Sequence, residues 1–407
     1  MIDKEATNLI FNASPYSINR WTSVLKQFLF VGSLSDQVTI LNPVAATVGA
    51  MMKDHSITAA MVDPWLVTWK ETLFVTHSVG DIIFNGYHDP LFDHVEDLIK
   101  ALPFIKQFIP EGSLMDKFGF FYGRNNTDYI DGVWNMFTGA GDNSKMGKVT
   151  SWNYTEQLPW FDGECGKVKG GAGEFYPPGL DKTYIEMFSN DLCRSLRFNY
   201  TRELIVKGIN SYEFVADEGF FANGTVNPAN ACFDSPDIPS GVYDSSACRY
   251  GAPVFVSQPH FYQADPYYAS MIQSGLAPNS SLHSTVFRVE PNSGIPLDVS
   301  ARFQLNVLIE PIKNIAILEH VPKTYFPVMW FENKAGVPDE LVFKMKLLAN
   351  LHEILEGVGW FQLGIVLSIL IISLIVVLSR KRTVDKDQCP ILSESINEDS
   401  QDEFEEE

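Results

Sequence analysis

Apolar and polar residues alternate over two short segments near the start of the chain. The alternation covers residues 7–11 and 36–41, and a polar loop separates the two segments. Side chains of a β-strand point to opposite faces in turn, so this period of two predicts a pair of strands.

The pattern changes between residues 43 and 110. Pro43 begins an Ala- and Met-rich run that ends at Met52, and apolar residues recur over 62–75. Proline is favoured in the first turn of a helix, so these features predict a small helical bundle over 43–110. Residues 61–70 are apolar on nearly every side, which favours burial inside this bundle. The alternative is an exposed contact surface.

Short strand patterns separated by Gly and Pro fill residues 115–338. The clearest alternation runs over 297–307, as expected for an antiparallel strand with one buried face. The other predicted strands are 118–122, 148–152, 212–215, 253–257, 285–289 and 305–309. An amphipathic helix is predicted over 339–357.

One long apolar run follows, from Trp360 to Leu378, without any charged residue. As a helix, a run of this length spans about 28 Å, close to the thickness of a bilayer core. Arg380, Lys381 and Arg382 come directly after it, and cytosolic flanks of membrane spans are enriched in such residues. We therefore predict a transmembrane helix over 359–379, which this length and flank favour over a buried core helix.

The chemistry on the two sides of this run differs. Six glycosylation sequons precede it, at Asn12, Asn125, Asn153, Asn199, Asn223 and Asn279. Four cysteines also precede it, and no two of them form a C-x-x-C pair, so disulfides are favoured over zinc. Four cysteines allow three pairings, and their spacing does not choose among them. Residues 1–357 are thus predicted to be extracytoplasmic, and 380–407 to form a cytosolic acidic tail that is disordered at its end.

The formal net charge is −20. The tail holds 10 acidic and four basic residues, which leaves a net −14 for the rest of the chain. Nucleic-acid binding needs clustered basic residues, so this balance argues against a nucleic-acid partner. Residues 1–7 lack the basic and apolar regions of a signal peptide, so we expect an incomplete N-terminus or a shortened isoform.

Motifs for catalysis and cofactor binding are absent from the sequence. There is no H-E-x-x-H and no G-x-S-x-G, and the eight histidines lack metal-ligand spacing. Residues 141–149 only superficially resemble a phosphate loop, and 170–173 fail the dinucleotide pattern. We predict a protein that is not an enzyme and has no cofactor or metal, although an acidic chain leaves a carboxylate pair open.

Two features of the tail indicate trafficking chemistry. Asp387 precedes Ile391 and Leu392 by the spacing of acidic dileucine signals, which clathrin adaptors bind. Cys389 is predicted to be a reduced thiol or, alternatively, a palmitoylation site.

An ordered series of motifs resembles the class B scavenger receptor family. That family includes the fatty-acid translocase, the lysosomal integral membrane protein and insect sensory neuron and epithelial membrane proteins. The matching segments are 118–127, 131–139, 191–195, 251–254, 259–261, 290–306 and 327–331. Residues 173–178, GEFYPP, resemble the arthropod branch.

The resemblance implies an α+β membrane protein with a large antiparallel β-barrel ectodomain. The barrel would occupy 115–338, with an apical helical bundle over 43–110, an apolar lipid tunnel and spans at both chain ends. It also implies the disulfides Cys165–Cys232 and Cys193–Cys248, while Phe233 stands in place of a cysteine of a third bridge. An N-terminal stretch that relatives carry, with a first span and early strands, is missing from this sequence, and a barrel lacking those strands exposes unpaired edges.

By the same resemblance, the chain is expected to be a scavenger receptor that binds lipids or lipoproteins and passes lipid toward the membrane. Fatty acids, sterols and carotenoids are ligands of the expected class, at the plasma membrane or in the endosome-lysosome membrane. Lys70, Trp65, Trp69 and Phe74 are the candidate ligand contacts. The alternative is a recognition or trafficking receptor for a protein or microbial ligand, without lipid transfer, in which Trp65, Trp69 and Phe74 form the exposed contact surface. The cargo, the balance between surface and lysosome, and the oligomeric state are not specified by the sequence.

Overall fold

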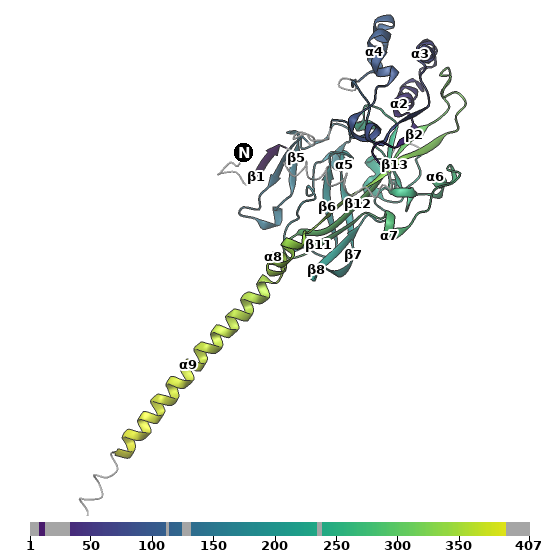
Figure 1. The fold of residues 1–407 in the computed structure, drawn as a ribbon. Helices are drawn as coiled ribbons and strands as arrows, with labels where there is room; N and C mark the ends of the chain where they lie inside the picture. Colours follow the sequence, from purple (N-terminus) through teal and green to yellow (C-terminus); the bar gives the residue numbers. More distant parts are fainter. Residues whose placement is uncertain (1–7, 13–32, 111–113, 124–131, 234–237, 388–407) are drawn as a thin grey trace, which may run out of the picture. The chain divides into compact units, whose positions relative to one another are not determined.

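The computed structural model describes residues 8–12, 33–110, 114–123, 132–233 and 238–387. The chain divides into two compact units, Met1–Val342 and Phe343–Glu407 (Figure 1). Mixed helix and strand make up the first unit, whereas the described part of the second is helical.

An eight-stranded antiparallel sheet forms the centre of the first unit. Its strand order is β6-β7-β8-β11-β12-β10-β9, and β13 pairs with β12 as well. The bounds are β6 (Tyr184–Ser189), β7 (Arg194–Val206), β8 (Ile209–Val215), β9 (Val242–Asp244), β10 (Val254–Ser257), β11 (Val286–Glu290), β12 (Ile295–Ile309) and β13 (Thr324–Gly336). Strand β12 pairs with three strands. Its first half pairs with β11, its second half pairs with β10, and β13 pairs with it from Asp298 to Ile309.

A three-stranded sheet continues this one. It holds β1 (Asn8–Asn12), β4 (Val133–Phe137) and β5 (Val149–Trp152) in the order β1-β4-β5. The segment at Gly171 links the two sheets: Val149 donates its N–H to the Gly170 carbonyl (2.8 Å), and Gly171 donates to Glu186 of β6 (2.8 Å). A separate two-stranded antiparallel sheet pairs β2 (Gln37–Leu41) with β3 (Phe74–Ser78).

The closed barrel that the resemblance implies is not present among the described residues. Closure requires every strand to have a partner on both edges. In the part of the chain that the structure describes, β1 and β13 each have a ladder partner on one edge only. The observed architecture is therefore an open, extended antiparallel sheet.

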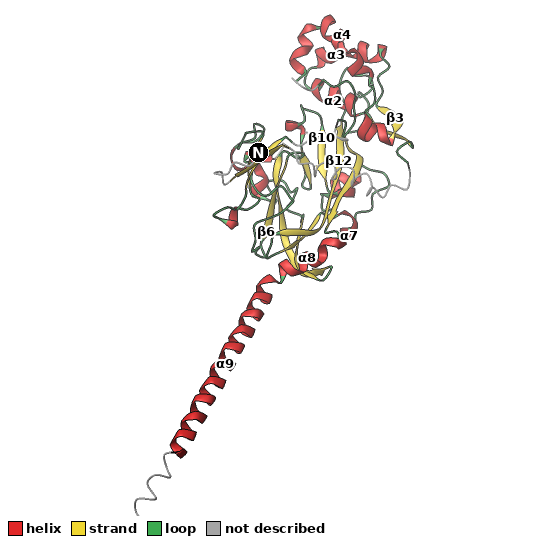
Figure 2. Ribbon diagram, turned by 60° about the vertical axis from the view of Figure 1, so that its left-hand side comes forward, coloured by secondary structure: helices red, strands yellow, loops and turns green. Residues whose placement is uncertain are grey.

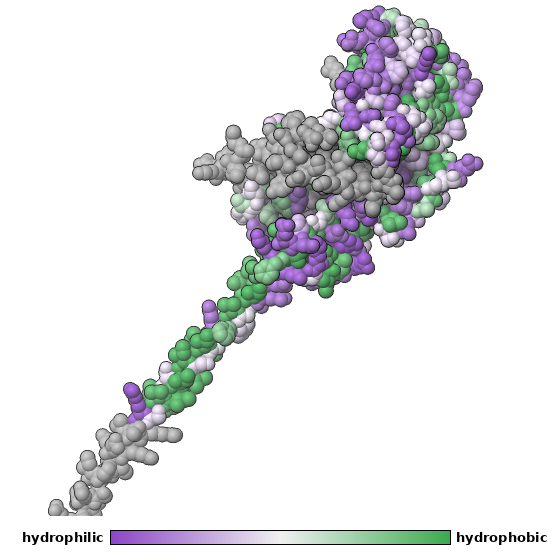
Figure 3. Space-filling model, in the orientation of Figure 1, coloured by the Kyte–Doolittle hydropathy of each residue, from purple (hydrophilic) through white to green (hydrophobic). Residues whose placement is uncertain are grey.

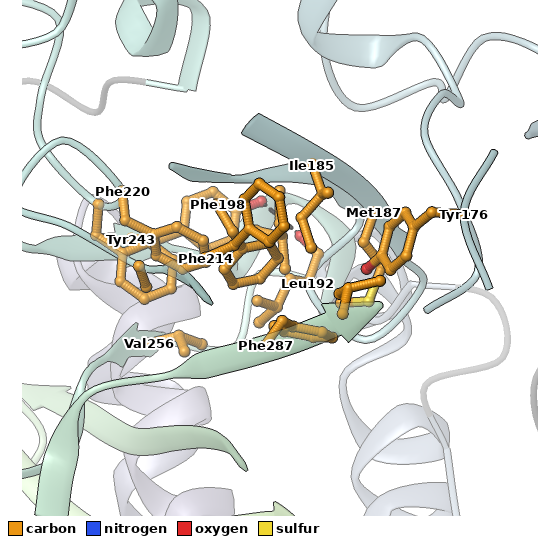
Figure 4. Packing of buried hydrophobic residues seen from close by; sticks show 14 residues of the cluster. Tyr176, Ile185, Met187, Leu192, Phe198, Phe214, Phe220, Tyr243, Val256 and Phe287 are labelled. Atoms are coloured by element: carbon orange, nitrogen blue, oxygen red, sulfur yellow. Dashed lines mark hydrogen bonds between the residues drawn. The ribbon is translucent and has the colours of Figure 1, made fainter. Parts of the chain in front are cut away.

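Aromatic side chains dominate the core on this sheet. Phe198 of β7, Phe214 of β8 and Phe287 of β11 are fully or almost fully buried, and Figure 4 shows them gathered between Ile185 and Tyr243. The ring centroids of Phe198 and Phe287 lie 4.6 Å apart. Along β7, the buried Leu196 and Phe198 alternate with more exposed residues, as the period of a strand requires.

Three helices lie together in the first unit (Figure 2). They are α2 (Pro43–Met52), α3 (Ser56–Thr68) and α4 (Pro90–Ala101), followed by the 3-10 helix η2 (Pro103–Phe108). We call these four elements the helical lobe. Their apolar residues form one cluster with Ile312, Ile315 and Leu318 of the β12–β13 connection. Pro43 begins α2 as predicted.

Two predictions for this part of the chain were wrong. The helix expected over 62–75 ends at Thr68, and β3 begins at Phe74 after a turn. The strand expected over 118–122 is a turn: Phe120 and Phe121 donate to carbonyls of the π-helix η1 (Asp81–Asn85) instead of a strand. The apolar pattern of this segment reflects packing on η1, since Phe121 is buried in the cluster of Ile82 and Phe84.

The remaining short helices of the first unit connect strands. They are η3 (Asn143–Lys145), α5 (Gly163–Gly166), η4 (Pro228–Phe233), η5 (Ser246–Cys248), η6 (Pro259–Phe261), α6 (Pro266–Ser270) and α7 (Ser280–His283).

Two helices close the described chain, α8 (Asp339–Ala349) and α9 (Leu351–Asp387). Within α9, Glu353–Arg380 is long and apolar enough to cross a membrane. This stretch contains the predicted span 359–379, and Figure 3 shows apolar side chains along most of its visible face.

Candidate functional site

The end of α3 fixes the position of Lys70. The residue has a φ of 59°, and its N–H bonds the Val67 carbonyl (3.1 Å) while the N–H of Glu71 bonds the Leu66 carbonyl (2.9 Å). This pair of bonds is a Schellman motif, in which the residue after the helix adopts the left-handed conformation. The turn leaves the Lys70 side chain exposed and directs Glu71 into the interior.

Trp65 of α3 and Trp69, directly after α3, are half-buried in the lobe. Their ring centroids lie 5.7 Å apart, and Trp69 also stacks on His94 of α4 at 5.4 Å. Phe74 is exposed at the start of β3, with its ring 6.2 Å from that of Phe326 in β13. The structure thus brings Trp65, Trp69 and Lys70 together at one helix end, while Phe74 begins the following strand.

Burial within α3 is divided between two faces. Ala59, Val62 and Leu66 are buried in the lobe. On the other side, Ile57 is 74% exposed and Val67 59% exposed, and Met61 is also exposed. Large apolar side chains with this much exposure favour a contact surface on α3.

A pocket of about 180 Å³ lies between α2 and the strands β10 and β12. One wall consists of Ala46, Gly49 and Ala50 of α2 and of Lys53 directly after it, which share one helix face by their spacing of three and four. The remaining apolar wall is formed by Pro253, Phe255, Leu308, Ile309, Ile312 and Leu318. Gly49 lets α2 approach the β12–β13 connection closely, because a Cβ at this position would lie 2.2 Å from Leu318 Cδ1.

Polar groups also line this pocket. Lys53 Nζ lies 2.6 Å from Glu310 Oε1, and Ser246 also contributes to the lining. Such a lining can hold an aliphatic chain whose polar end meets the ion pair. Sequence reasoning missed the pocket because its walls come from three distant segments. The signal available was the row of small residues on one face of α2.

The described residues contain no group of three or more His, Cys, Asp or Glu side chains arranged to hold a metal ion. The cysteines of the first unit form two disulfides, Cys165–Cys232 and Cys193–Cys248.

The glycosylation sequons differ in their surroundings. Asn153 and Asn279 are exposed, whereas Asn199 and Asn223 are half-buried. Asn12 is the last residue of β1, and Asn125 lies outside the described residues. In the tail, Asp387 ends α9, while Cys389, Ile391 and Leu392 lie outside the described residues.

Comparison with known proteins identifies the family to which this sequence is similar. Residues 12–377 match the sequence model of the CD36 family. The chain is 34% identical over 333 residues to protein peste of Drosophila melanogaster, covering 80% of this chain and 58% of that protein. It is 32% identical over 340 residues to scavenger receptor class B member 1 of Mus musculus, covering 81% of this chain and 64% of that protein. Lysosome membrane protein 2 of Homo sapiens is 27% identical over 332 residues, with 81% and 66% covered. The chain therefore spans about 58 to 66% of the length of these relatives.

Proposed function

The chain belongs to the CD36 family, and from this premise we propose that it is a membrane-anchored receptor that binds lipids or lipoproteins and passes lipid toward the membrane. The single observation that carries the proposal is the apolar pocket between α2 and the strands β10 and β12.

The energetics of the pocket suit a lipid ligand. Burial of each CH₂ group contributes about 0.8 kcal/mol, so an aliphatic chain gains several kcal/mol on entering an apolar cavity. The pocket volume of about 180 Å³ accommodates part of such a chain, and Lys53, Glu310 and Ser246 offer partners to its polar end. Transfer along an apolar tunnel needs no covalent step, in keeping with a receptor that is not an enzyme.

The helical lobe is the proposed site of first contact. In this proposal it is apical, Lys70 and Phe74 meet the ligand, and Trp65 and Trp69 support them from α3. Exposure of Lys70 and Phe74 supports this arrangement, and the half-buried tryptophans supply a rigid base. Fatty acids, sterols, carotenoids and lipoproteins all satisfy the chemistry proposed.

The membrane arrangement is part of the same proposal. Residues 359–379 of α9 cross the bilayer, the first unit is extracytoplasmic and 380–407 are cytosolic, at the plasma membrane or the endosome-lysosome membrane. Arg380, Lys381 and Arg382 support this orientation. In the tail, Asp387, Ile391 and Leu392 bind a clathrin adaptor, and Cys389 carries palmitate or remains a thiol.

Native mass spectrometry of the full chain in detergent micelles, after incubation with an isotope-labelled long-chain fatty acid, tests the lipid site. Wild type should retain the labelled lipid, and Ala50→Trp should lose it because the new ring fills the pocket. Ala60→Trp is the matched control, since Ala60 lies exposed on α3. The proposal fails if wild type binds no lipid, or if both variants bind as wild type does while remaining folded.

A second function is favoured by the exposed apolar face of α3. Ile57, Met61 and Val67 present large side chains to solvent, which suits recognition of a protein or microbial ligand without lipid transfer. In that case, replacing Met61 and Val67 by Ser should abolish partner binding, while Ala50→Trp leaves partner binding intact.

A further inference from the structure

Three helix ends meet at one buried side chain, Asn42. The residue follows β2 and caps α2: its Oδ1 accepts N–H bonds from Val44 (2.9 Å) and Ala45 (3.4 Å). Its Nδ2 donates to Glu71 Oε1 (2.6 Å), beyond the end of α3, and to Asp89 Oδ2 (3.2 Å), the cap of α4. Asn42 therefore joins two carboxyl groups that come from different elements.

Both carboxyl groups are almost completely buried. Glu71 is 5% exposed and Asp89 is fully buried. Asp89 Oδ1 accepts from the Leu91 N–H (3.0 Å), so both of its oxygens are occupied. Glu71 Oε2 is buried without a hydrogen-bond partner among the described residues. A carboxylate oxygen in this position has lost its water and gained nothing in return, which is costly for an ionised group.

The groups around the pair do not neutralise it. No Lys or Arg among the described residues forms an ion pair with Glu71 or Asp89. The buried hydroxyl of Tyr87 is near them and also has no described partner, and the Tyr87 ring stacks on His77 at 4.1 Å. Asp93 of α4 adds negative charge near Asp89, and its carboxylate bonds His88 Nδ1 (3.1 Å). The groups that favour the charged forms are hydrogen-bond donors: the Asn42 side chain for both carboxyl groups, the Thr72 backbone for Glu71 and the Leu91 backbone for Asp89.

We propose that Glu71 and Asp89 form a proton-binding site in which the two carboxyl groups share one proton, and that loss of this proton loosens the junction of α2, α3 and α4. With the proton present, Glu71 is neutral, and its carboxyl O–H donates a hydrogen bond to the Asp89 carboxylate. Each oxygen of the pair then has a partner. Without the proton, two negative charges face each other inside the lobe. The repulsion between them decreases when the end of α3 moves outward.

The pKa shifts of the two carboxyl groups give the pH range over which the pair loses its proton. Burial, followed by the charge of Asp89, raises the pKa of Glu71 to about 7, and burial raises the pKa of Asp89. A carboxyl group with a raised folded-state pKa contributes its stability fully below its unfolded pKa, near 4.5. That contribution is lost as the pH rises through the folded pKa. The lobe therefore tightens in mild acid and loosens at neutral pH, with the opening equilibrium changing up to about tenfold per pH unit between roughly pH 5 and 7.

Hydrogen–deuterium exchange of the full chain in detergent micelles tests this directly. Peptides that cover α3 and α4 are followed at pH 5.5 and 7.5, after correction for the intrinsic exchange rate. Wild type should show at least a tenfold higher protection at pH 5.5. Glu71→Gln should show the same high protection at both values, because its amide permanently replaces the protonated carboxyl.

Two further variants keep the test decisive. Asp89→Asn retains the cap on α4 and removes the neighbouring charge, so it should move the midpoint to lower pH even if Glu71→Gln folds poorly. Glu96→Gln, at an exposed position on α4, is the matched control and should keep the wild-type pH dependence. The inference is overturned if wild-type protection does not change with pH, or if Glu71→Gln and Asp89→Asn both retain the wild-type midpoint.

Discussion

The imidazole rings of His260 and His283 stack with their centroids 4.3 Å apart and their planes 8° from parallel. Each ring accepts a backbone N–H at Nδ1, from Ala277 and from Asn279, both at 3.0 Å. Nδ1 accepts a hydrogen bond only when it carries no proton, so this arrangement requires both imidazoles to be neutral.

Acid should therefore destabilise the region that joins η6, α7 and β13. Burial lowers the pKa of His260, and burial followed by the charges of His260 and Arg302 lowers that of His283. A histidine with a lowered folded pKa contributes stability above its unfolded pKa, near 6.5, and loses it as the pH falls through the folded value. The direction is opposite to that of the Glu71–Asp89 pair.

Thermal unfolding between pH 7.5 and 5 measures this effect. The loss of stability in acid should shrink in His283→Asn, whose Oδ1 can accept the Asn279 N–H without titrating. His320→Asn, at an exposed position, should behave as wild type. An unchanged acid loss in His283→Asn would contradict the prediction.

The disulfide between Cys193 and Cys248 should contribute substantially to stability. It joins residues 55 apart, and closing a loop of this length contributes about 4 kcal/mol in the chain-entropy model. The double variant Cys193→Ser/Cys248→Ser should lower the free energy of unfolding by this order, as measured by chemical denaturation. Cys389→Ser is the control and should leave the unfolding curve where it is. A loss below about 1 kcal/mol would indicate a denatured state already constrained in this region.

Some strands could be predicted from the sequence because their alternation is local, whereas the 13-residue strands β7 and β13 were not predicted. Residues 36–41, 253–257 and 297–307 correspond to β2, β10 and β12, within a few residues at each end. The segment 118–122 has the same apolar character, yet it is a turn, because η1 rather than a neighbouring strand receives its backbone bonds. Pairing partners are a tertiary property that a strand pattern does not contain.

The candidate site was harder to predict from the sequence for the same reason. Trp65, Trp69 and Lys70 were predictable as one group because they lie within one short stretch of sequence, although the helix end that brings them together was not predicted. Glu71 and Asp89 meet through Asn42, which is 29 and 47 residues away along the chain. A signal was present, since Asn42-Pro43 and Asp89-Pro90 each have the cap and first residue of a helix. That signal predicts where two helices begin, but it does not predict that the two helix N-termini lie next to each other.

Glycan occupancy should follow the freedom of each sequon amide. Asn153 and Asn279 are exposed, so their Nδ2 groups are accessible for modification. Asn199 lies within β7 and donates its Nδ2 to Asp217 Oδ2 (2.6 Å). Glycopeptide mass spectrometry of the expressed chain should find high occupancy at Asn153 and Asn279 and low occupancy at Asn199. Full occupancy at Asn199 would mean that modification precedes formation of the β7–β8 pair.

Lys70 offers a test that separates ligand contact from structure. Its φ of 59° is unfavourable for a residue with a Cβ, so Lys70→Gly should stabilise the lobe by about 1 kcal/mol. The same substitution removes the positive charge that we propose meets the ligand. Binding of an anionic lipid or lipoprotein should therefore weaken while thermal stability rises, and these opposite signs cannot come from a damaged fold. Lys106→Gln, at another exposed lysine of the lobe, is the control for general charge attraction. Equal weakening by both variants would assign the effect to net charge, whereas unchanged binding in Lys70→Gly would remove Lys70 from the contact surface.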